Sequence, residues 1–186
     1  MIAGQYRSRP LRSLPGLDIR PTADRLRETL FNVLTAGNPG ALEGSVWADL
    51  FAGTGAVGIE ALSRGAGKVF FVESARPAIQ VIQSNLKALE VTAGFDLVQG
   101  DVGKTLRRWQ AQGMLPDYVF LDPPYRLEEE YRATLEFLGN STLLKASTIV
   151  IAEHTKKFEP VECAGVLRKC RTLVQGDAAL SFYRKE

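Results

Sequence analysis

Short apolar segments alternate with helical patterns along most of this sequence, and this alternation is the strongest constraint on its fold. Runs rich in Val, Phe and Ile predict five buried strands, at residues 46–51, 69–73, 95–101, 118–122 and 148–153. Helical patterns lie between them, at residues 57–64, 78–89, 103–112 and 128–138. Strands that alternate with helices predict right-handed crossovers and a mainly parallel sheet covered on both faces.

The two ends of the chain depart from this alternation. Residues 1–21 are rich in Arg, Pro and Gly, which predicts an extended arm or a short hairpin. Thr22 is the expected N-cap of a leading helix, in which Leu26 and Leu30 recur at helical spacing. Gly176-Asp177 lies between two further strand patterns and predicts an antiparallel hairpin at the sheet edge. We therefore expect a doubly wound α/β fold with a mostly parallel, seven-stranded sheet.

Composition places the chain among ordinary globular domains, because 45% of its 186 residues are apolar and 24% are charged. We expect residues 1–40 to form a basic extension and leading helix that belong to the same unit as a domain over residues 41–186. No apolar run approaches a membrane span, so a cytoplasmic protein is the expectation, with a monomer as the default. Cys163 and Cys170 have no Cys or His at metal-ligand spacing, and His154 is the sole histidine, so no metal site is expected.

The net charge of +2 is concentrated at the front of the chain. Residues 1–34 carry a net charge of +3, so the other 152 residues sum to −1. The basic residues of this segment are all arginines: Arg7, Arg9, Arg12, Arg20, Arg25 and Arg27. Guanidinium groups bind phosphate in a planar, bidentate way, so a polyanionic partner is one interpretation and a solvated arm is the other.

A glycine-rich segment joins the first strand to the next helix. Gly53, Gly55 and Gly58 fit the GxGxxG pattern of dinucleotide binding, and Glu73 ends the second strand, where a carboxylate can accept ribose hydroxyls. Asp49, however, would place a negative charge near the position of a pyrophosphate. We therefore favour a cationic ligand without phosphate, and S-adenosylmethionine fits that description. A glycine-rich turn that only saves space is the structural alternative.

The fourth strand ends in Asp122-Pro123-Pro124-Tyr125, the most specific feature of the sequence. Two prolines remove two backbone donors and stiffen the turn, which leaves free carbonyls beside a carboxylate and an aromatic ring. Asp122 and the Pro123 carbonyl can accept the two N–H bonds of an exocyclic amine, and Tyr125 can stack on the base. Asp101 ends the third strand and could accept the amine of adenine, or it could simply cap the following helix.

These motifs resemble those of a known family, the bacterial small-subunit ribosomal RNA guanine-N2 methyltransferases, which modify a single guanine of 16S rRNA. The resemblance covers nearly the whole chain. The residues that carry it are Ile2-Ala-Gly4, Arg7, Arg9, Leu11, Arg20-Pro-Thr22, Asp24-Arg25, Arg27-Glu28, Leu30-Phe-Asn32, Asp49 to Gly55, Glu60 to Ala66, Glu73, Asn85-Leu86, Gly100-Asp101 and Asp122 to Tyr125. The Arg20-Pro-Thr22 helix narrows the match, whereas Gln175 stands where the family's last hairpin usually carries an aromatic residue.

The resemblance implies a class I fold of the S-adenosylmethionine-dependent, Rossmann-like type. It implies that S-adenosylmethionine is the cofactor and that the substrate is a guanine of 16S rRNA, in the small subunit or its assembly intermediate. The cofactor residues that it implies are Asp49, Phe51, Ala52, Gly53, Thr54, Gly55, Glu73, Asp101 and Val102. The catalytic residues would be Asp122, Pro123 and Tyr125, and the RNA-binding residues Arg7, Arg9, Arg20, Arg25 and Arg27.

Several alternatives stay open at this level. An adenine-N6 methyltransferase, a nicotinamide-dependent oxidoreductase and a non-catalytic RNA-binding module would each use part of the pattern. Arg25 and Arg27 could form an ordinary surface pairing with Asp24 and Glu28. His154 could line the pocket mouth or be structural, and Trp47 and Trp109 are expected in the core. Basic residues near the C-terminus could extend an RNA surface or merely solvate the edge hairpin: Lys156, Lys157, Arg168, Lys169 and Arg171.

Overall fold

Helices and strands alternate through most of the computed structural model, which describes residues 1–14, 21–124 and 127–186. The helices are α1 (Pro21–Leu34), α2 (Ala56–Ser63), α3 (Arg76–Ala88), α4 (Val102–Ala111) and α5 (Glu128–Gly139). The strands are β1 (Val46–Leu50), β2 (Lys68–Glu73), β3 (Phe95–Gln99), β4 (Tyr118–Leu121), β5 (Ile149–Thr155), β6 (Cys163–Ala164), β7 (Leu167–Gln175) and β8 (Ala178–Lys185). The predicted order of elements is confirmed, and the boundaries differ by one or two residues.

Within the described residues, all the strands belong to one eight-stranded sheet in the order β3-β2-β1-β4-β5-β8-β7-β6. Strands β1 to β5 pair in parallel, whereas β8, β7 and β6 add antiparallel strands at one edge. The doubly wound α/β prediction is therefore confirmed, with one strand more than the seven expected. The additional strand β6 has two residues, which are too few to produce a periodic pattern in a sequence.

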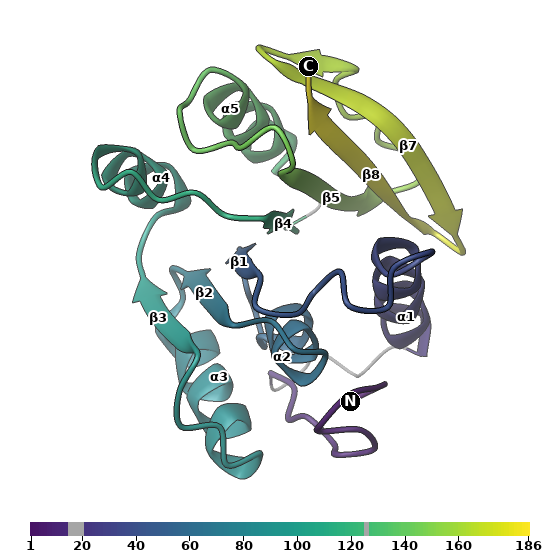
Figure 1. Cartoon of the computed structure of the whole chain (residues 1–186), viewed down its shortest axis with the longest axis vertical. Coiled ribbons are helices and arrows are strands. Elements are labelled where there is room, and N and C mark those ends of the chain that lie inside the picture. The colour runs from purple at the N-terminus through teal and green to yellow at the C-terminus, as the bar shows by residue number, and fades with distance from the viewer. Residues whose placement is uncertain (15–20, 125–126) are drawn as a thin grey trace.

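Figure 1 shows the sheet between two layers of helices, with α1, α2 and α3 on one face and α4 and α5 on the other. Each face has its own apolar core. Trp47 lies between Phe31 and Tyr118 in a stack, with ring centroids 5.5 and 4.8 Å away, and Trp109 packs edge-on against Phe70 on the other face. Both tryptophans are thus core residues, as predicted.

The leading helix begins two residues earlier than the sequence suggested, because an N-cap at Thr22 would place the first helical residue at position 23. Helix α1 includes Pro21, so Thr22 lies within its first turn and not at the N-cap position. Proline suits the first helical position, because the N–H that it lacks would have no intrahelical acceptor there.

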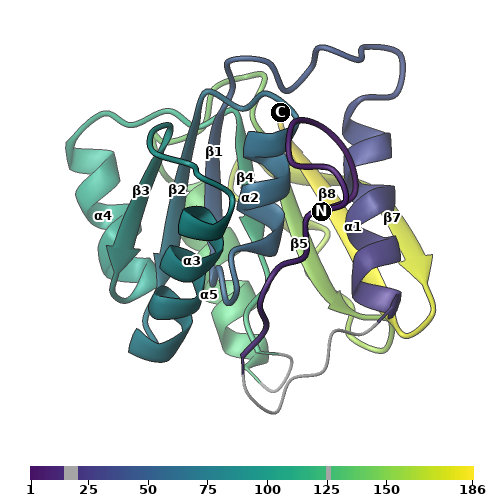
Figure 2. The ribbon, with the colours of Figure 1, turned by 90° about the horizontal axis from the view of Figure 1, so that it is seen from below.

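The N-terminal arm, residues 1–14, is a loop with a turn at residues 5–8 and no strand, so a strand-paired hairpin is not found among these residues. The loop closes on itself, because the Met1 amino group donates to the Arg9 carbonyl at 2.6 Å and the Ser8 N–H donates to the Met1 carbonyl. Figure 2 shows it running past α2. Met1, Tyr6 and Leu11 pack against the same apolar core as α1, α2 and α3.

The C-terminal hairpin turns at Gly176-Asp177, as predicted, and Gly176 has a positive φ of 65° that suits glycine. Gln175, the residue that departs from the family pattern, contacts the leading helix. Its side-chain oxygen accepts a hydrogen bond from the Thr29 hydroxyl at 2.8 Å. A polar link thus joins the hairpin to α1 at this position.

Among residues 1–14, 21–124 and 127–186, no helix is long and apolar enough to cross a lipid bilayer. The same residues contain no group of three or more His, Cys, Asp or Glu side chains arranged to hold a metal ion. Cys163 and Cys170 are both exposed and carry free thiols.

Candidate active site

The strand order reverses between β1 and β4, and the carboxyl ends of four strands meet around that point. Leu50 at the end of β1 is paired with Leu121 of β4, and Leu121 is paired with Ala152 of β5. The Asp122 N–H, one residue beyond β4, donates to the Leu50 carbonyl at 3.4 Å. In open α/β sheets, ligands bind outside the carboxyl ends of the strands at this kind of switch point.

The turn from β1 into α2 has a backbone that favours glycine. Gly53 and Gly55 have φ values of 54° and 75°, and Phe51 is one of the few non-glycine residues with a positive φ, at 60°. Such strained residues cluster at ligand sites. A Cβ at Gly58 would lie 2.4 Å from the Phe71 ring, so only glycine lets α2 approach β2 this closely.

Glu73 holds the turn in place from the end of β2. One carboxylate oxygen accepts the Gly53 N–H at 2.9 Å, and the other accepts the Ala75 N–H at 2.8 Å. Each carboxylate oxygen can accept a second bond, and Glu73 is only partly buried. The residue predicted to hold a ribose therefore also orders the turn that would surround the rest of the ligand.

Asp49 is buried, at 2% exposure, and its Oδ2 accepts the Gly58 N–H at 2.9 Å. Burial raises the pKa of the Asp49 carboxyl to about 8, although the hydrogen bond from Gly58 acts in the opposite direction. The negative charges of Glu73 and Glu153 raise this pKa further. The site thus holds a carboxyl whose ionised form requires a nearby positive charge.

Asp122 is the second perturbed carboxyl. Burial, followed by the charges of Glu153 and Asp49, raises the pKa of Asp122 well above its ordinary value. Pro123 is buried, and its carbonyl accepts from the Tyr131 hydroxyl at 3.2 Å, while the same hydroxyl lies 2.6 Å from the Glu153 carbonyl. Tyr131 therefore ties the turn after β4 to β5.

Glu153 was not singled out in the sequence, yet it lies on β5 directly after Ala152, the last residue of that strand paired with β4. A carboxylate near the end of a predicted parallel strand was the available signal. Asp49, Glu73, Asp122 and Glu153 place four acidic groups at this edge of the sheet, and their mutual repulsion contributes to the raised pKa values of Asp49 and Asp122. A cationic ligand would favour the ionised forms of these carboxyls, whereas a pyrophosphate would add to the repulsion, which argues against a dinucleotide.

Asp101 caps α4, since its side chain accepts the Lys104 N–H at 2.8 Å. It lies at the same edge as the other carboxylates, because the preceding residue, Gly100, donates its N–H to the Glu73 carbonyl. Asp101 is exposed, whereas Val102 is buried. The cap is thus observed, and a contact of Asp101 or Val102 with an adenine ring stays a prediction.

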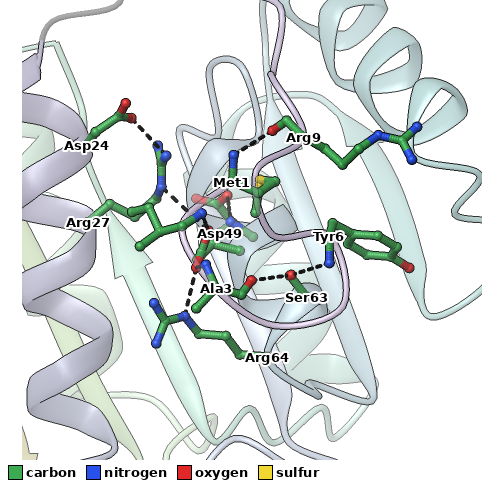
Figure 3. A network of polar contacts seen from close by, with 12 residues as sticks. Met1, Ala3, Tyr6, Arg9, Asp24, Arg27, Asp49, Ser63 and Arg64 are labelled. Atoms are coloured by element: carbon green, nitrogen blue, oxygen red, sulfur yellow. Dashed lines mark hydrogen bonds and ion pairs between the residues drawn. The ribbon is translucent and has the colours of Figure 1, made fainter.

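The predicted RNA-binding arginines fall into two groups. Arg7 and Arg25 are exposed, and Arg9 is exposed while its guanidinium donates to the Ala88 carbonyl at 2.7 Å. Arg27, by contrast, has a side chain only 11% exposed, which pairs with Asp24 at 2.8 Å as the surface-pairing alternative proposed (Figure 3). Arg20 and Tyr125 lie outside the described residues.

Arg27 and the arm converge on Glu60, a fully buried residue of α2. The Glu60 carboxylate accepts the N–H groups of Ile2 and Ala3 at 2.9 and 3.0 Å. It also pairs with Arg64 at 2.8 Å and lies 4.0 Å from the Arg27 Nε. This cluster fastens the arm to the domain.

The remaining candidates have structural surroundings. His154 is 3% exposed, and its ring nitrogens contact the carbonyl of the adjacent Thr155 and the Ser181 hydroxyl. The contact with Ser181 links β5 to β8. Burial lowers the pKa of His154. Among the C-terminal basic residues, Lys156 pairs with Asp177 at 2.8 Å and Arg168 with Glu186 at 3.2 Å.

The sheet order, the glycine-rich turn after β1 and the acidic switch point define a class I S-adenosylmethionine-dependent methyltransferase fold. Residues 1–184 match the family described as Conserved hypothetical protein 95, and the chain belongs to that family. A solved Escherichia coli structure, described as the candidate methyltransferase yhhF, superposes with a TM-score of 0.84 at 32% identity, covering 100% of this chain and 97% of that one.

Two curated relatives carry more specific names. Ribosomal RNA small subunit methyltransferase D of Escherichia coli K12 is 36% identical over 191 residues, which cover 100% of this chain and 89% of the relative. A Bacillus subtilis protein, YlbH, named as a candidate rRNA methyltransferase, is 34% identical over 185 residues, which cover 100% of this chain and 98% of the relative.

Proposed function

We propose that this protein transfers a methyl group from S-adenosylmethionine to the exocyclic N2 amine of a guanine in small-subunit ribosomal RNA. The observation that carries the proposal is the position of Asp122 and the Pro123 carbonyl, which follow β4 directly beside the glycine-rich turn that follows β1. The names of the two curated relatives support an RNA substrate.

The residues at the switch point fit this cofactor. The turn from Asp49 to Gly55, including Phe51, Ala52, Gly53 and Thr54, would surround its methionine part, Glu73 would accept its ribose hydroxyls, and Asp101 and Val102 would lie beside its adenine. The buried Asp49 carboxyl, whose pKa is about 8, favours a ligand with an ammonium group. When bound, the cofactor would supply a methyl group on a positively charged sulfur.

Asp122 and Pro123 would orient the target amine. The carboxylate and the carbonyl each accept one N–H of the amine, so that the nitrogen lone pair turns toward the methyl group. The amine is a poor nucleophile, and holding it in a near-attack geometry is worth roughly 7 kcal/mol or more. Tyr131 supports this geometry because its hydroxyl contacts the Pro123 carbonyl.

A proton must leave the amine after the methyl group is transferred. The raised pKa of Asp122 makes its ionised carboxylate a better proton acceptor than an ordinary aspartate. Tyr125 would stack on the unstacked base in place of its lost neighbour.

Arg7, Arg9 and Arg25, which are exposed, would hold the RNA backbone together with Arg20. Arg27 is engaged with Asp24 and lies near Glu60, so it would act mainly by holding α1 against α2. We further propose that residues 1–40 work as one unit with residues 41–186, as a monomer that acts on the small subunit or its assembly intermediate.

The experiment is transfer of labelled methyl from S-adenosylmethionine to small ribosomal subunits that lack their native methylations, followed by nucleoside analysis. We expect N2-methylguanosine from the native protein and none from the Asp122→Ala variant. Asp96→Ala is the matched control, because Asp96 is a half-exposed aspartate on β3 paired with Lys68. Label in N6-methyladenosine would overturn the proposed target but keep the cofactor, and absence of label despite cofactor binding would overturn the proposed reaction on this RNA.

A further inference from the structure

Asn85 on α3 connects two segments that lie far apart in the sequence, the N-terminal arm and the glycine-rich turn after β1. Its side chain is 1% exposed and lies between the N-terminal arm and the glycine-rich turn. Its Oδ1 accepts the Arg12 N–H at 2.7 Å, and its Nδ2 donates to the Arg12 carbonyl and to the Thr54 carbonyl, both at 3.1 Å. One side-chain amide thus contacts the arm twice and the proposed cofactor turn once.

The three partners determine which residue type can stand at this position. Two carbonyls need donors and one N–H needs an acceptor, which fixes the orientation of the amide. Aspartate would lack both donors, and leucine of similar size would lack all three bonds. Asparagine at this position can therefore join Arg12 to Thr54, whereas aspartate and leucine cannot.

The neighbours of Asn85 on α3 support the same junction. Ile82, one helical turn earlier and fully buried, packs under Gly55, where an added Cβ would come within 3.1 Å of its side chain. Ser84 accepts a hydrogen bond from the Arg12 guanidinium at 2.9 Å. Helix α3 thus presents Ile82 to the turn, Ser84 to the arm and Asn85 to both.

The opposite part of the arm is anchored to α2. The Ser63 hydroxyl donates to the Ala3 carbonyl at 2.6 Å and accepts the Tyr6 N–H at 2.9 Å (Figure 3). A Cβ on Gly4, whose φ is +75°, would lie 1.8 Å from the Ser63 carbonyl oxygen. Displacement of the arm at Gly4 would therefore reach Arg12 and, through Asn85, the turn.

We propose that Asn85 is a positioning residue that couples docking of the N-terminal arm to cofactor binding at the glycine-rich turn. The inference rests on the proposed function, because it takes the turn as the cofactor site. Coupling between two sites is reciprocal, so a cofactor that orders the turn also stabilises the docked arm. An RNA that binds only the docked arm would raise the affinity for the cofactor, and the cofactor would raise the affinity for that RNA by the same factor.

The first test compares the full-length native protein with Asn85→Leu and the control Gln83→Ala, at an exposed position on the same helix. Titration calorimetry measures S-adenosylhomocysteine affinity, and hydrogen exchange measures protection of residues 1–14 with and without this ligand. We expect the ligand to slow exchange in the arm of the native protein and of Gln83→Ala. In Asn85→Leu the affinity falls about tenfold, and saturating ligand leaves arm exchange unchanged.

A second variant keeps the test decisive if Asn85→Leu does not fold. Gly4→Ala displaces the arm without touching the turn, so we expect this variant alone to weaken S-adenosylhomocysteine binding several-fold. Where Asn85→Leu folds, adding Gly4→Ala to it should weaken binding no further. Unchanged affinity in Gly4→Ala, or purely additive effects of the two substitutions, would overturn the coupling. A native protein that binds the ligand without arm protection also overturns it, whereas one that binds no ligand overturns the proposed function as well.

Discussion

Glu60 on α2 and Asp49 on β1 are both buried carboxyls, at 0% and 2% exposure, yet their surroundings carry opposite charge. Glu60 accepts two backbone N–H bonds from the arm and pairs with Arg64 at 2.8 Å. Asp49 accepts a backbone N–H bond from Gly58 and lies under the influence of Glu73 and other carboxylates.

The difference separates a buried charge that stabilises the fold from one that serves a ligand. A carboxylate with its own cations and donors joins the elements that carry them, here the arm, α1 and α2. A carboxyl among other carboxyls opposes folding when it ionises, because its pKa is raised to about 8. Such an arrangement is expected at sites where function takes precedence over stability.

The largest effect is expected on the free energy of unfolding when Glu60 is replaced. Glu60→Ala leaves Arg64 and two backbone N–H groups without their acceptor, so the free energy of unfolding falls by about 3–5 kcal/mol, the usual cost of breaking a buried pair. Urea denaturation measures the loss. Glu136→Ala is the control, since Glu136 is exposed on α5. Equal stability of the two variants would show that the network does not anchor the arm.

For Asp49→Asn we expect the opposite result to that for Glu60→Ala, a loss of cofactor affinity without a loss of stability. Loss of one partner of a buried charge pair costs about 2–5 kcal/mol, so S-adenosylmethionine affinity should fall roughly 30-fold or more. The free energy of unfolding should not decrease, because the substitution removes a charge that opposes folding. Calorimetry and urea denaturation test both points, with Asp96→Asn as the surface control. Loss of stability with unchanged affinity would reverse the roles assigned to Asp49 and Glu60.

The pH dependence of cofactor affinity and of stability tests the role assigned to Asp49. With a pKa of about 8, the ionised fraction of Asp49 rises from roughly a tenth at pH 7 to roughly nine-tenths at pH 9, so affinity for the cationic cofactor should rise up to about tenfold. The stability of the ligand-free protein should change in the opposite direction, because a raised pKa stabilises the fold at low pH and that contribution is lost as pH rises toward 8. Asp49→Asn should flatten both profiles, and an unchanged slope would assign the titration to another group.

Much of the fold follows from local patterns in the sequence. The strand and helix periods predict the parallel sheet, and Gly176-Asp177 predicts the hairpin, because these signals lie within a few neighbouring residues. The two-residue β6 carries no such pattern and depends on pairing with β7. The start of α1 was misplaced by two residues, since Pro21 and Thr22 both suit a helix N-terminus.

The candidate site could be predicted only in part, and for a physical reason. Asp49, Glu73 and Asp122 each lie within one residue of a strand's carboxyl end, so their meeting at one sheet edge follows from parallel pairing alone. The roles of Glu60 and Asn85 depend on contacts across 58 and 73 residues of chain, which no local pattern reports.

The smallest effect concerns the exposed side of the Glu60 network. Asp24 is 49% exposed and pairs with Arg27 three residues later on α1, so Asp24→Asn should lower the free energy of unfolding by only about 0.2–0.5 kcal/mol. Added salt should erase that difference, whereas it should leave most of the Glu60→Ala loss in place, because buried pairs are screened much less. Urea denaturation at low and high salt measures both. A loss near that of Glu60→Ala would mean that Asp24 is what keeps Arg27 directed at Glu60, which would extend the buried network to the surface of α1.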